Sequence, residues 1–357
     1  MIPFATMQSK QGGPGRYRRT TLRDVAAAAG VDVSTVSKVL NDNSQINVRP
    51  ATRERIMAAA DELRYRPDPV ARSLRYGHSG ALGMLFPDLT NPVYGLIMRG
   101  AAQRAGELGY AILLAELGDE NTPSSYERLV EEHRIDGLVI ATSRDNSDVL
   151  EKLPAAAPHV YANRRARGAG PSVIVDDEAA GSLAAQSLLA AGHTRLAFIG
   201  DSDETDTARR RRLGFVNACR KAAVPDPVDI LTPYTRAGGF GAMETLLDLD
   251  HVPTGAFASS LLVGIGSLAA ARERNVTVPD DLSLVTLDAE DAEYSAPPLS
   301  AIRLPLREMG AAAVEMIDRV IRGEPSSDLV VPIPPSLIER DSIGPPPNQD
   351  PRDDVTA

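Results

Sequence analysis

The sequence lacks several residue types that carry chemistry or membrane anchoring in other protein classes. Its 357 residues include no Trp, 4% aromatic residues and one cysteine, Cys219. A single cysteine cannot form an internal disulfide, so we predict a half-buried apolar role for it and no metal site. No run approaches the roughly 20 apolar residues of a membrane helix, and residues 1–19 have no apolar signal-peptide core. These absences predict a soluble cytoplasmic protein with a disordered leader over residues 1–19.

Motifs that mark enzymes on α/β folds are also missing. The chain has no G-x-x-x-x-G-K-[ST], no G-x-G-x-x-G after a first strand and no G-x-S-x-G. Gly264 and Gly266 lie in a run typical of a helix, and the five histidines show no triad or metal-ligand spacing. We therefore predict that the protein is not an enzyme and uses no cofactor. An enzyme or a solute-binding protein built on the same kind of core is the alternative.

Charge is distributed unevenly along the chain. The formal net charge is −10, which taken alone argues against binding to nucleic acid. Residues 1–79, however, hold 13 Lys and Arg against 7 Asp and Glu, a net charge of +6 that leaves −16 for the rest. A basic head on an acidic body suits a protein that meets phosphate groups with one end. A basic tail without a role is the alternative.

Three short helices are expected in the basic head. Thr21 can cap the first helix, with Asp24 as its capping-box partner, and Gly30 is expected to end it. A second helix begins near Val33, and a third begins at Pro50, a favourable first-turn residue. Apolar residues at helical spacing form the predicted core of this head: Leu22, Val25, Ala26, Ala29, Val36, Val39, Leu40, Ile56, Ala59, Ala60 and Leu63.

From Ala81 onward, short apolar runs alternate with amphipathic stretches. The runs predict strands at Ala81–Phe86, Ala111–Leu114, Gly137–Ala141, His159–Ala162, Val173–Val175, Leu196–Ile199, Gly255–Ala258 and Leu282–Leu287. Helices are predicted at Pro92–Leu108, Tyr126–Arg134, Glu178–Ala191, Thr207–Ala223, Gly238–Leu249, Leu261–Arg274 and Leu306–Ile321. This alternation is typical of parallel sheets covered on both faces. The number of units favours two doubly wound subdomains, with ligands at the carboxyl ends of strands.

Motif fragments recur in a fixed order along the chain. In the head they are Thr21-Leu22, Asp24–Ala26, Ala29–Val31, Thr35–Ser37, Val39–Asn41, Thr52-Arg53, Arg55-Ile56, Glu62-Leu63, Tyr65, Pro67 and Val70–Arg75. In the body they are Asp88–Pro92, Arg134–Val139, Asp176-Asp177, Gly192-His193, Arg195 and Val278–Ser283. Together they resemble the lactose-repressor (LacI/GalR) family over roughly residues 20–340.

The resemblance implies a domain organisation. Residues 20–67 would form a three-helix helix-turn-helix headpiece, and residues 68–79 a hinge helix and linker. Residues 80–340 would form an α/β core, a periplasmic-binding-protein-like pair of doubly wound parallel-sheet subdomains joined by chain crossovers. Residues 341–357 are expected to form a disordered tail. The family further implies a homodimer, a palindromic operator in double-stranded DNA, a small-molecule effector and repression, with activation left open.

The second helix is implied to read DNA. By match to the family, Val33, Ser34 and Lys38 face base edges in the major groove, where Lys38 can donate to guanine. Phosphate contacts, which position but do not specify, are implied for Thr21, Thr35, Ser37 and Asn41. A surface hydroxyl without a DNA role is the alternative for Ser37. Asp32 departs from the family's usual Ser, so one backbone contact is expected to be lost.

The hinge helix is implied to enter the minor groove. Leu74 is an apolar residue on a short basic helix, and two such leucines from a dimer can wedge into a central base step. Arg72 and Arg75 would then face the groove or phosphates. Packing of Leu74 against its own headpiece is the alternative. Because so short a helix is marginal alone, we expect it to form only with DNA and a partner subunit.

The core is implied to bind an effector. Matches to the family pocket are Tyr94, Arg211, Tyr234, Ser260 and Asp288. The two tyrosines could instead be cleft-wall residues that make no ligand contact. The family often has Asn-Asp where this chain has Ser259-Ser260, so a charged acceptor for sugar hydroxyls is missing. A non-sugar ligand, or none, is therefore an alternative to a sugar effector.

Overall fold

The computed structural model of the chain describes residues 20–40, 48–65, 78–116, 125–141, 157–165, 170–202, 204–287 and 290–347. The chain divides between His78 and Ser79 into two compact units, which we call the headpiece and the core. Within the described residues, no helix is long and apolar enough to cross a membrane.

The headpiece contains helices α1 (Leu22–Ala29), α2 (Val33–Leu40) and α3 (Pro50–Glu62). The predicted capping box is confirmed, because Thr21 and Asp24 each accept a hydrogen bond from the other's backbone N–H. Gly30 ends α1 at φ 63°, a left-handed conformation that is least costly for glycine. Pro50 is the first residue of α3, where its missing N–H costs no helical hydrogen bond.

The headpiece core confirms the predicted apolar set. Each of the three helices turns one apolar face, formed by residues at helical spacing, toward the other two helices. The buried members are Val25, Ala26, Ala29, Val36, Val39, Ile56, Ala59 and Ala60, and Leu22, Leu40 and Leu63 pack against them half-buried.

The first sheet of the core has the strand order β11-β5-β4-β3-β1-β2, and all its pairs are parallel. Its strands are β1 (Ala81–Phe86), β2 (Ala111–Glu116), β3 (Gly137–Ile140), β4 (His159–Ala162), β5 (Ser172–Ile174) and β11 (Leu329–Val330). Helices α5 (Pro92–Leu108), α6 (Ser125–Glu131) and α12 (Leu306–Ile321) pack on it.

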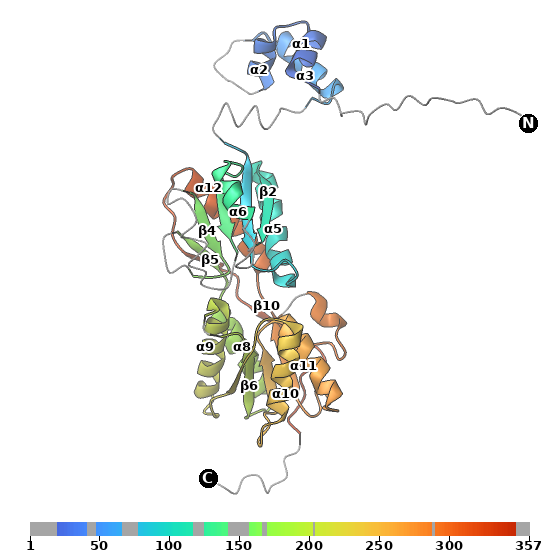
Figure 1. Cartoon of the computed structure of the whole chain (residues 1–357), viewed down its shortest axis with the longest axis vertical. Helices are drawn as coiled ribbons and strands as arrows, with labels where there is room; N and C mark the ends of the chain where they lie inside the picture. The colour runs from blue at the N-terminus through green and yellow to red at the C-terminus, as the bar shows by residue number, and fades with distance from the viewer. Residues whose placement is uncertain are drawn as a thin grey trace, which may run out of the picture. The chain divides into compact units, whose positions relative to one another are not determined.

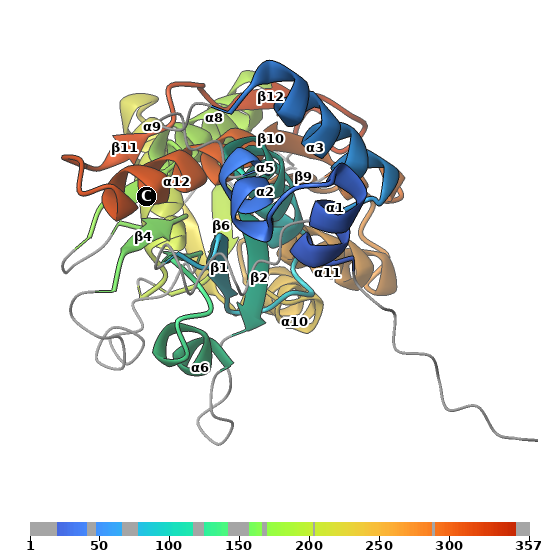
Figure 2. The same cartoon turned by 90° about the horizontal axis from the view of Figure 1, so that it is seen from above.

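The second sheet has the order β12-β10-β9-β8-β6-β7, parallel except for the antiparallel β10–β12 pair. Its strands are β6 (Leu196–Gly200), β7 (Val228–Leu231), β8 (Gly255–Ala258), β9 (Ser283–Leu287), β10 (Ser300–Arg303) and β12 (Ser336–Ile338). Its helices are α8 (Asp177–Ala190), α9 (Asp206–Lys221), α10 (Arg236–Leu247) and α11 (Leu261–Glu273), and a 3₁₀ turn, η1, spans Glu290–Tyr294. α8 lies beside α9, and α10 beside α11 (Figure 1; Figure 2).

Alternating side chains bury both faces of each sheet. In β6, Phe198 packs with the side chains of α8 and α9, whereas Ile199 packs with those of α10 and α11. In the first sheet, Met84 faces α5 and α12, and its neighbour Leu85 faces Tyr126 of α6. Because inner strands such as β1, β6 and β8 are covered on both sides, their apolar runs are continuous, as the sequence pattern indicated.

The chain crosses between the sheets after β5, after β10 and after β11. These crossovers confirm the predicted fold class of two doubly wound subdomains. The sequence analysis missed β7, β10, β11 and β12, which are short and sit at or near sheet edges. Their patterns are weak because an edge strand such as β7 leaves Leu231 60% exposed.

The prediction that the tail is disordered from residue 341 is wrong for its first residues. Ser342 is fully buried: its hydroxyl accepts from the N–H of Ser300 at 2.8 Å and donates to the carbonyl of Leu284 at 2.5 Å. The N–H of Gly344 donates to Ser283 at 3.0 Å. The polar composition of this segment did not indicate burial. The buried Ser342 is a polar residue, and its hydroxyl is satisfied by hydrogen bonds to backbone groups.

Candidate nucleic-acid interface and effector site

One face of α2 is turned to solvent. Val33, Ser34 and Lys38 are exposed, whereas Val36 and Val39 are buried in the headpiece core. At 100° per residue the exposed side chains, with the half-buried Ser37 among them, cover a continuous arc of the helix. Val33 is 39% exposed, which is unfavourable in water and favourable against a thymine methyl group. The structure therefore brings the three predicted base-reading residues onto one accessible surface.

The predicted phosphate-binding residues are placed less uniformly. Thr35 and Ser37 are half-buried on α2, and Thr21 is exposed but uses its hydroxyl to donate to Asp24 at 2.8 Å. The carbonyl of Asp32 accepts from the N–H groups of Thr35 and Val36, so α2 starts normally despite the departure at this position. Asn41, Leu74, Arg72 and Arg75 lie outside the described residues.

The core contains a buried cluster of polar side chains at the carboxyl ends of its strands. We call it the polar cluster; its members are Asn163 and Arg164 after β4, Asp177 at the start of α8, Asp206, Arg210 and Arg211 on α9, Tyr234 after β7 and Ser259 after β8. Elements from both sheets supply it. The carboxyl ends of parallel strands are the ordinary place for a ligand in such folds.

Arg211 lies at the centre of the polar cluster and is 4% exposed. Its Nε donates to Asp177 at 2.7 Å, and its Nη1 donates to the carbonyl of Ser259 at 2.9 Å. Tyr234 also contacts this guanidinium, and its hydroxyl is 3.4 Å from that of Ser259. Burial lowers the pKa of Arg211, but the charges and hydrogen bonds of Asp177 and Tyr234 together outweigh burial and hold the pKa above its usual value. Arg211 is thus a fixed cation.

Tyr234 is held neutral beside this cation. Burial raises the pKa of Tyr234, and the Arg211 guanidinium and the Ser259 hydroxyl offset only part of that rise. A neutral phenol can both donate and accept a hydrogen bond. Tyr234 is therefore suited to contact a polar ligand beside Arg211.

Arg210 joins the two subdomains. Its Nη1 lies 2.6 Å from Asp177 and donates to the carbonyl of Val175 at 2.9 Å, in the crossover after β5. Its Nε donates to Asp206 at 2.9 Å. Asp206 in turn accepts from the N–H of Arg165, just after β4, at 3.1 Å. These contacts tie the end of the first sheet to α9 of the second.

The other predicted effector residues are only partly brought together. Ser260 accepts from the N–H of Val263 at 3.3 Å as the cap of α11, so its hydroxyl already has a structural partner. Tyr94 is buried in the first subdomain, with its ring centroid 5.4 Å from that of Phe86. Asp288 lies outside the described residues. Of the predicted effector residues, Arg211 and Tyr234 therefore lie in the polar cluster, whereas Ser260 caps α11.

Several members of the polar cluster were not predicted from the sequence, namely Asn163, Arg164, Asp177, Asp206 and Arg210. A signal existed for two of them. Asn163 and Arg164 directly follow the predicted strand His159–Ala162, the position where ligand residues gather in doubly wound folds. Asp206 and Arg210 could not be distinguished from surface helix charges by pattern alone.

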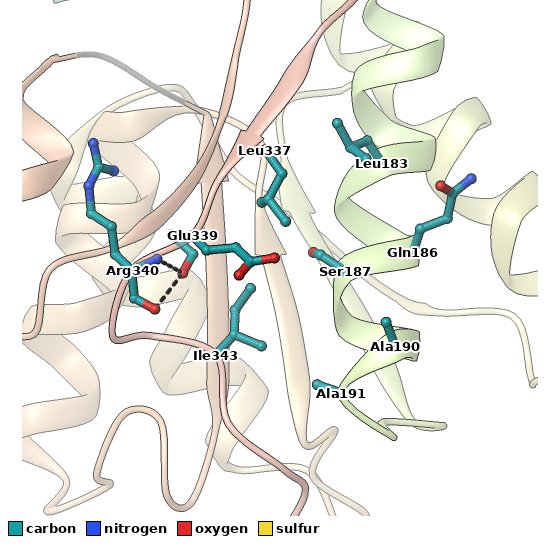
Figure 3. A pocket seen from close by; sticks show the side chains of 10 residues that line it. Leu183, Gln186, Ser187, Ala190, Ala191, Leu337, Glu339, Arg340 and Ile343 are labelled. Carbon is teal, nitrogen blue, oxygen red and sulfur yellow. Dashed lines mark hydrogen bonds between the residues drawn. The ribbon is translucent and has the colours of Figure 1, made fainter.

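A cavity of about 430 Å³ lies elsewhere on the core, between α8 and the chain around β12 (Figure 3). Leu183, Ser187 and Leu337 line it, and Figure 3 shows Arg340 pointing away. The cavity extends to Ala190 and Ala191, at the opposite end of α8 from Asp177. It is therefore separate from the polar cluster, and no polar side chain of that cluster reaches it.

Comparison with known families matches both units. Residues 21–68 match the family described as bacterial regulatory proteins, lacI family, and residues 185–343 match the periplasmic binding protein-like domain. Over 336 residues the chain is 32% identical to the HTH-type transcriptional regulator DegA of Bacillus subtilis (strain 168), covering 92% of this chain and 99% of that protein. The chain belongs to the LacI family. The predicted resemblance is confirmed.

Two further relatives support the assignment of the chain to the LacI family. The ribose operon repressor of Escherichia coli (strain K12) is 31% identical over 331 residues, 90% of this chain and 99% of that one. The crystal structure of the Lac repressor dimer bound to operator and the anti-inducer ONPF has a TM-score of 0.76 and 26% identity, covering 91% and 99% of the two chains. These relatives are transcriptional regulators, so the enzyme and solute-binding alternatives are not favoured.

Proposed function

We propose that this LacI-family regulator represses transcription by binding a palindromic operator as a homodimer, with its affinity controlled by a small molecule bound in the core. The exposed face of α2 carries the first part of this proposal, because the lacI-family match covers the three helices that present it. The Lac repressor structure, solved as a dimer on operator DNA, supports the mode of binding. Such a protein acts where the DNA is, in the cytoplasm.

We assign base reading to Val33, Ser34 and Lys38. Thr21, Thr35, Ser37 and Asn41 would contact phosphates and set the position of α2 in the groove. A hydroxyl has one proton to donate, so the side chain of Thr21 must then turn that proton from Asp24 to the phosphate. Leu74, flanked by Arg72 and Arg75, would wedge into the minor groove at the dyad.

We assign effector binding to the polar cluster, with Arg211 and Tyr234 as direct contacts and Tyr94, Ser260 and Asp288 as further members of the pocket. The cluster joins the end of β4 in one subdomain to α9 in the other. A ligand bound among these groups has different contacts when the angle between subdomains changes. Its binding energy can therefore shift the population of the DNA-binding form.

The base-reading assignment is tested by Lys38→Ala on duplexes selected from a random library. We expect discrimination at one operator position to fall by about 1–3 kcal/mol, the range for a direct base contact. The matched control is Lys221→Ala, which removes an exposed lysine of α9 in the core. A Lys38 variant with an unchanged profile across all operator positions would contradict the assignment.

The effector assignment is tested by Arg211→Ala. This substitution should abolish the change in operator affinity that the effector causes, and it should leave operator binding without effector intact. Since the substitution removes one of the two arginines that pair with the buried Asp177, Tyr234→Phe serves as the milder variant. It removes one hydroxyl and should weaken effector affinity by about tenfold, the value of one hydrogen bond to a ligand. Retained ligand sensitivity in both variants would refute the assignment.

A further inference from the structure

The chain enters the core at Ser79 and Gly80, the first two residues of that unit. The carboxylate of Asp136, which directly precedes β3, accepts three hydrogen bonds from them. Oδ1 of Asp136 accepts from the N–H of Ser79 at 2.6 Å and from its hydroxyl at 3.0 Å, and Oδ2 accepts from the N–H of Gly80 at 2.8 Å. Both oxygens of one carboxylate therefore hold the entry point of the core.

Backbone bonds hold the following residues from both sides. The carbonyl of Gly80 accepts from the N–H of Ala111, where β2 begins, at 2.9 Å. The carbonyl of Ala81 accepts from the N–H of Asp136 at 2.8 Å. Gly80 has a φ of 69°, a left-handed conformation that costs a glycine little and that turns the chain into β1. The entry point is thus fixed in position and in direction by the starts of β1, β2 and β3.

The bonds to Asp136 are the part of this anchor that one substitution can remove. Hydrogen bonds from backbone N–H groups to a carboxylate are charge-assisted and about twice as strong as bonds between neutral groups. Without the carboxylate, Ser79 and the N–H of Gly80 lose their partner. The backbone bonds to Ala111 and from Asp136 remain, so the first residue still held in the sheet would be Ala81.

The position of the anchor matters because little chain precedes it. In the proposed DNA complex Leu74 lies at the dyad, and four residues of the sequence separate it from Ser79. Extended chain covers at most about 3.6 Å per residue, so Leu74 and Ser79 can lie at most about 18 Å apart. With Ala81 as the first fixed residue, the limit rises to about 25 Å. The bonds to Asp136 therefore shorten the reach of each protomer by about 7 Å.

We propose that Asp136 is a specificity-determining residue, which sets the spacing of the operator half-sites by anchoring the chain that leads to the headpiece. The proposal rests on the proposed binding of a palindromic operator by a homodimer. A reach of about 7 Å corresponds to about two base pairs of duplex, at about 3.4 Å each. Anchored protomers accept half-sites at one separation, whereas released protomers also reach half-sites that lie farther apart.

The spacing is tested with the full-length protein and duplexes in which zero to about four base pairs are added between the selected half-sites. Each added base pair moves the half-site and also turns it by about 35°. We expect two added base pairs to weaken binding by the parent about tenfold or more, because its anchored chain cannot follow. For Asp136→Ala the same addition should weaken binding about threefold or less. Gel-shift titration measures both, and a variant profile as narrow as that of the parent would overturn the proposal.

Asp328→Ala is the matched control for a general loosening of the sheet. Asp328 accepts from the N–H of Ser172 at 2.8 Å, where β5 begins, so the variant removes a similar bond from the same sheet away from the entry point. Its spacing profile should match that of the parent. A profile as broad as that of Asp136→Ala would contradict a specific role for Asp136.

A second control lengthens the chain and leaves the anchor intact. A Gly-Ser pair inserted between His78 and Ser79 adds about the same 7 Å of reach. The insertion should broaden the spacing profile as Asp136→Ala does. If the insertion leaves the profile narrow, the length of this chain does not set the spacing, and the proposal is wrong.

Asp136→Asn keeps the proposal testable where Asp136→Ala does not fold. The amide has one acceptor oxygen and no charge, so one of the two N–H groups loses its partner. We expect a spacing profile between those of the parent and of the Gly-Ser insertion. The melting temperature is measured on the same sample. A lowered melting temperature with the spacing profile of the parent would show that Asp136 acts in folding alone and would overturn the proposal.

This proposal and the proposed function fail in different ways. If the parent binds no duplex selected from a random library, the regulatory function fails, and the anchor proposal falls with it. If the parent binds a palindromic duplex as a dimer and the Asp136 variants keep its spacing profile, only the anchor proposal falls.

Discussion

The α2 face and the polar cluster use polar side chains in opposite ways. On α2, Ser34 and Lys38 are exposed and, in their proposed role, remain hydrated until DNA replaces water. In the polar cluster, Asp177 is fully buried between two arginines, and its charge is satisfied within the protein. The comparison teaches that side chains on an exposed helix face, such as the proposed DNA-reading face of α2, can vary without cost to the fold. A site that holds buried charges is part of the fold itself.

The comparison predicts its largest effect at Asp177. Asp177→Ala leaves Arg210 and Arg211 without their shared buried partner, so we expect the free energy of unfolding to fall by about 3–5 kcal/mol. The measurement is urea denaturation of the full chain. Asp229→Ala is the control, since its pair with Arg212 is partly exposed and is worth less than about 1 kcal/mol. Equal losses in the two variants would contradict the view that the polar cluster is part of the fold.

The buried His193 makes the stability of the core depend on pH. Its ring is buried and bonds Thr254, Ser283 and the carbonyl of Gly344. Burial lowers the pKa of His193, and the bond to Gly344 offsets this only in part. The unfolded chain then binds a proton at a higher pH than the folded core does. Stability contributed by the neutral ring is complete above pH 6.5 and is lost as the pH falls below that value.

The expected slope from this one proton is at most about 1.4 kcal/mol per pH unit. Denaturation of the core between pH 7.5 and 5 measures it. His193→Asn should lower the stability at neutral pH yet remove this part of the slope. A slope that stays the same in the variant would show that other groups cause it.

A substitution at Gly30 tests whether the stability of the headpiece depends on backbone conformation rather than on charge. Its φ of 63° is left-handed and nothing lies within 4 Å of an added Cβ, so Gly30→Ala costs conformational strain alone, about 1 kcal/mol. The loss is measured as the change in melting of the unit that carries the substitution, the headpiece for Gly30 and the core for the control. Gly95→Ala on α5 is the control, because Gly95 also has open space but an ordinary helical φ. A comparable loss at Gly95 would exclude strain as the cause.

The smallest effect is expected at Lys38. Its side chain is exposed on α2, so Lys38→Ala should change the free energy of unfolding by less than about 0.5 kcal/mol. The same headpiece melt measures it. A loss above about 1 kcal/mol would mean that the proposed DNA-reading face supports the fold. The α2 face would then not differ from the polar cluster in this respect.

Most of the fold follows from local patterns in the sequence. Buried residues recur at helical spacing within a helix, as Val25 and Ala29 do in α1, and runs such as Leu82–Phe86 are long enough to mark buried strands. Short edge strands were missed, because β7 alternates half-buried and exposed residues over only four positions. Ser342 was missed because its burial depends on the distant strands β9 and β10.

The sequence by itself determined the exposed face of α2. Helical periodicity places Val33, Ser34 and Lys38 opposite the buried Val36 and Val39, and no distant residue is needed to decide it. The capping of α1 by Thr21 and Asp24 was equally local. Such features follow from neighbours in the chain, so pattern analysis can find them.

Only the tertiary structure decided the composition of the polar cluster. Arg209, Arg210, Arg211 and Arg212 are identical in type, yet Arg210 and Arg211 are buried while the outer two are half-exposed. Which of them meets a partner depends on Asp177 and on the ends of β4 and β5, brought to α9 by crossovers between two sheets. Because burial and pairing of charge depend on these distant elements, the order of the residues alone could not tell Arg210 and Arg211 from their exposed neighbours.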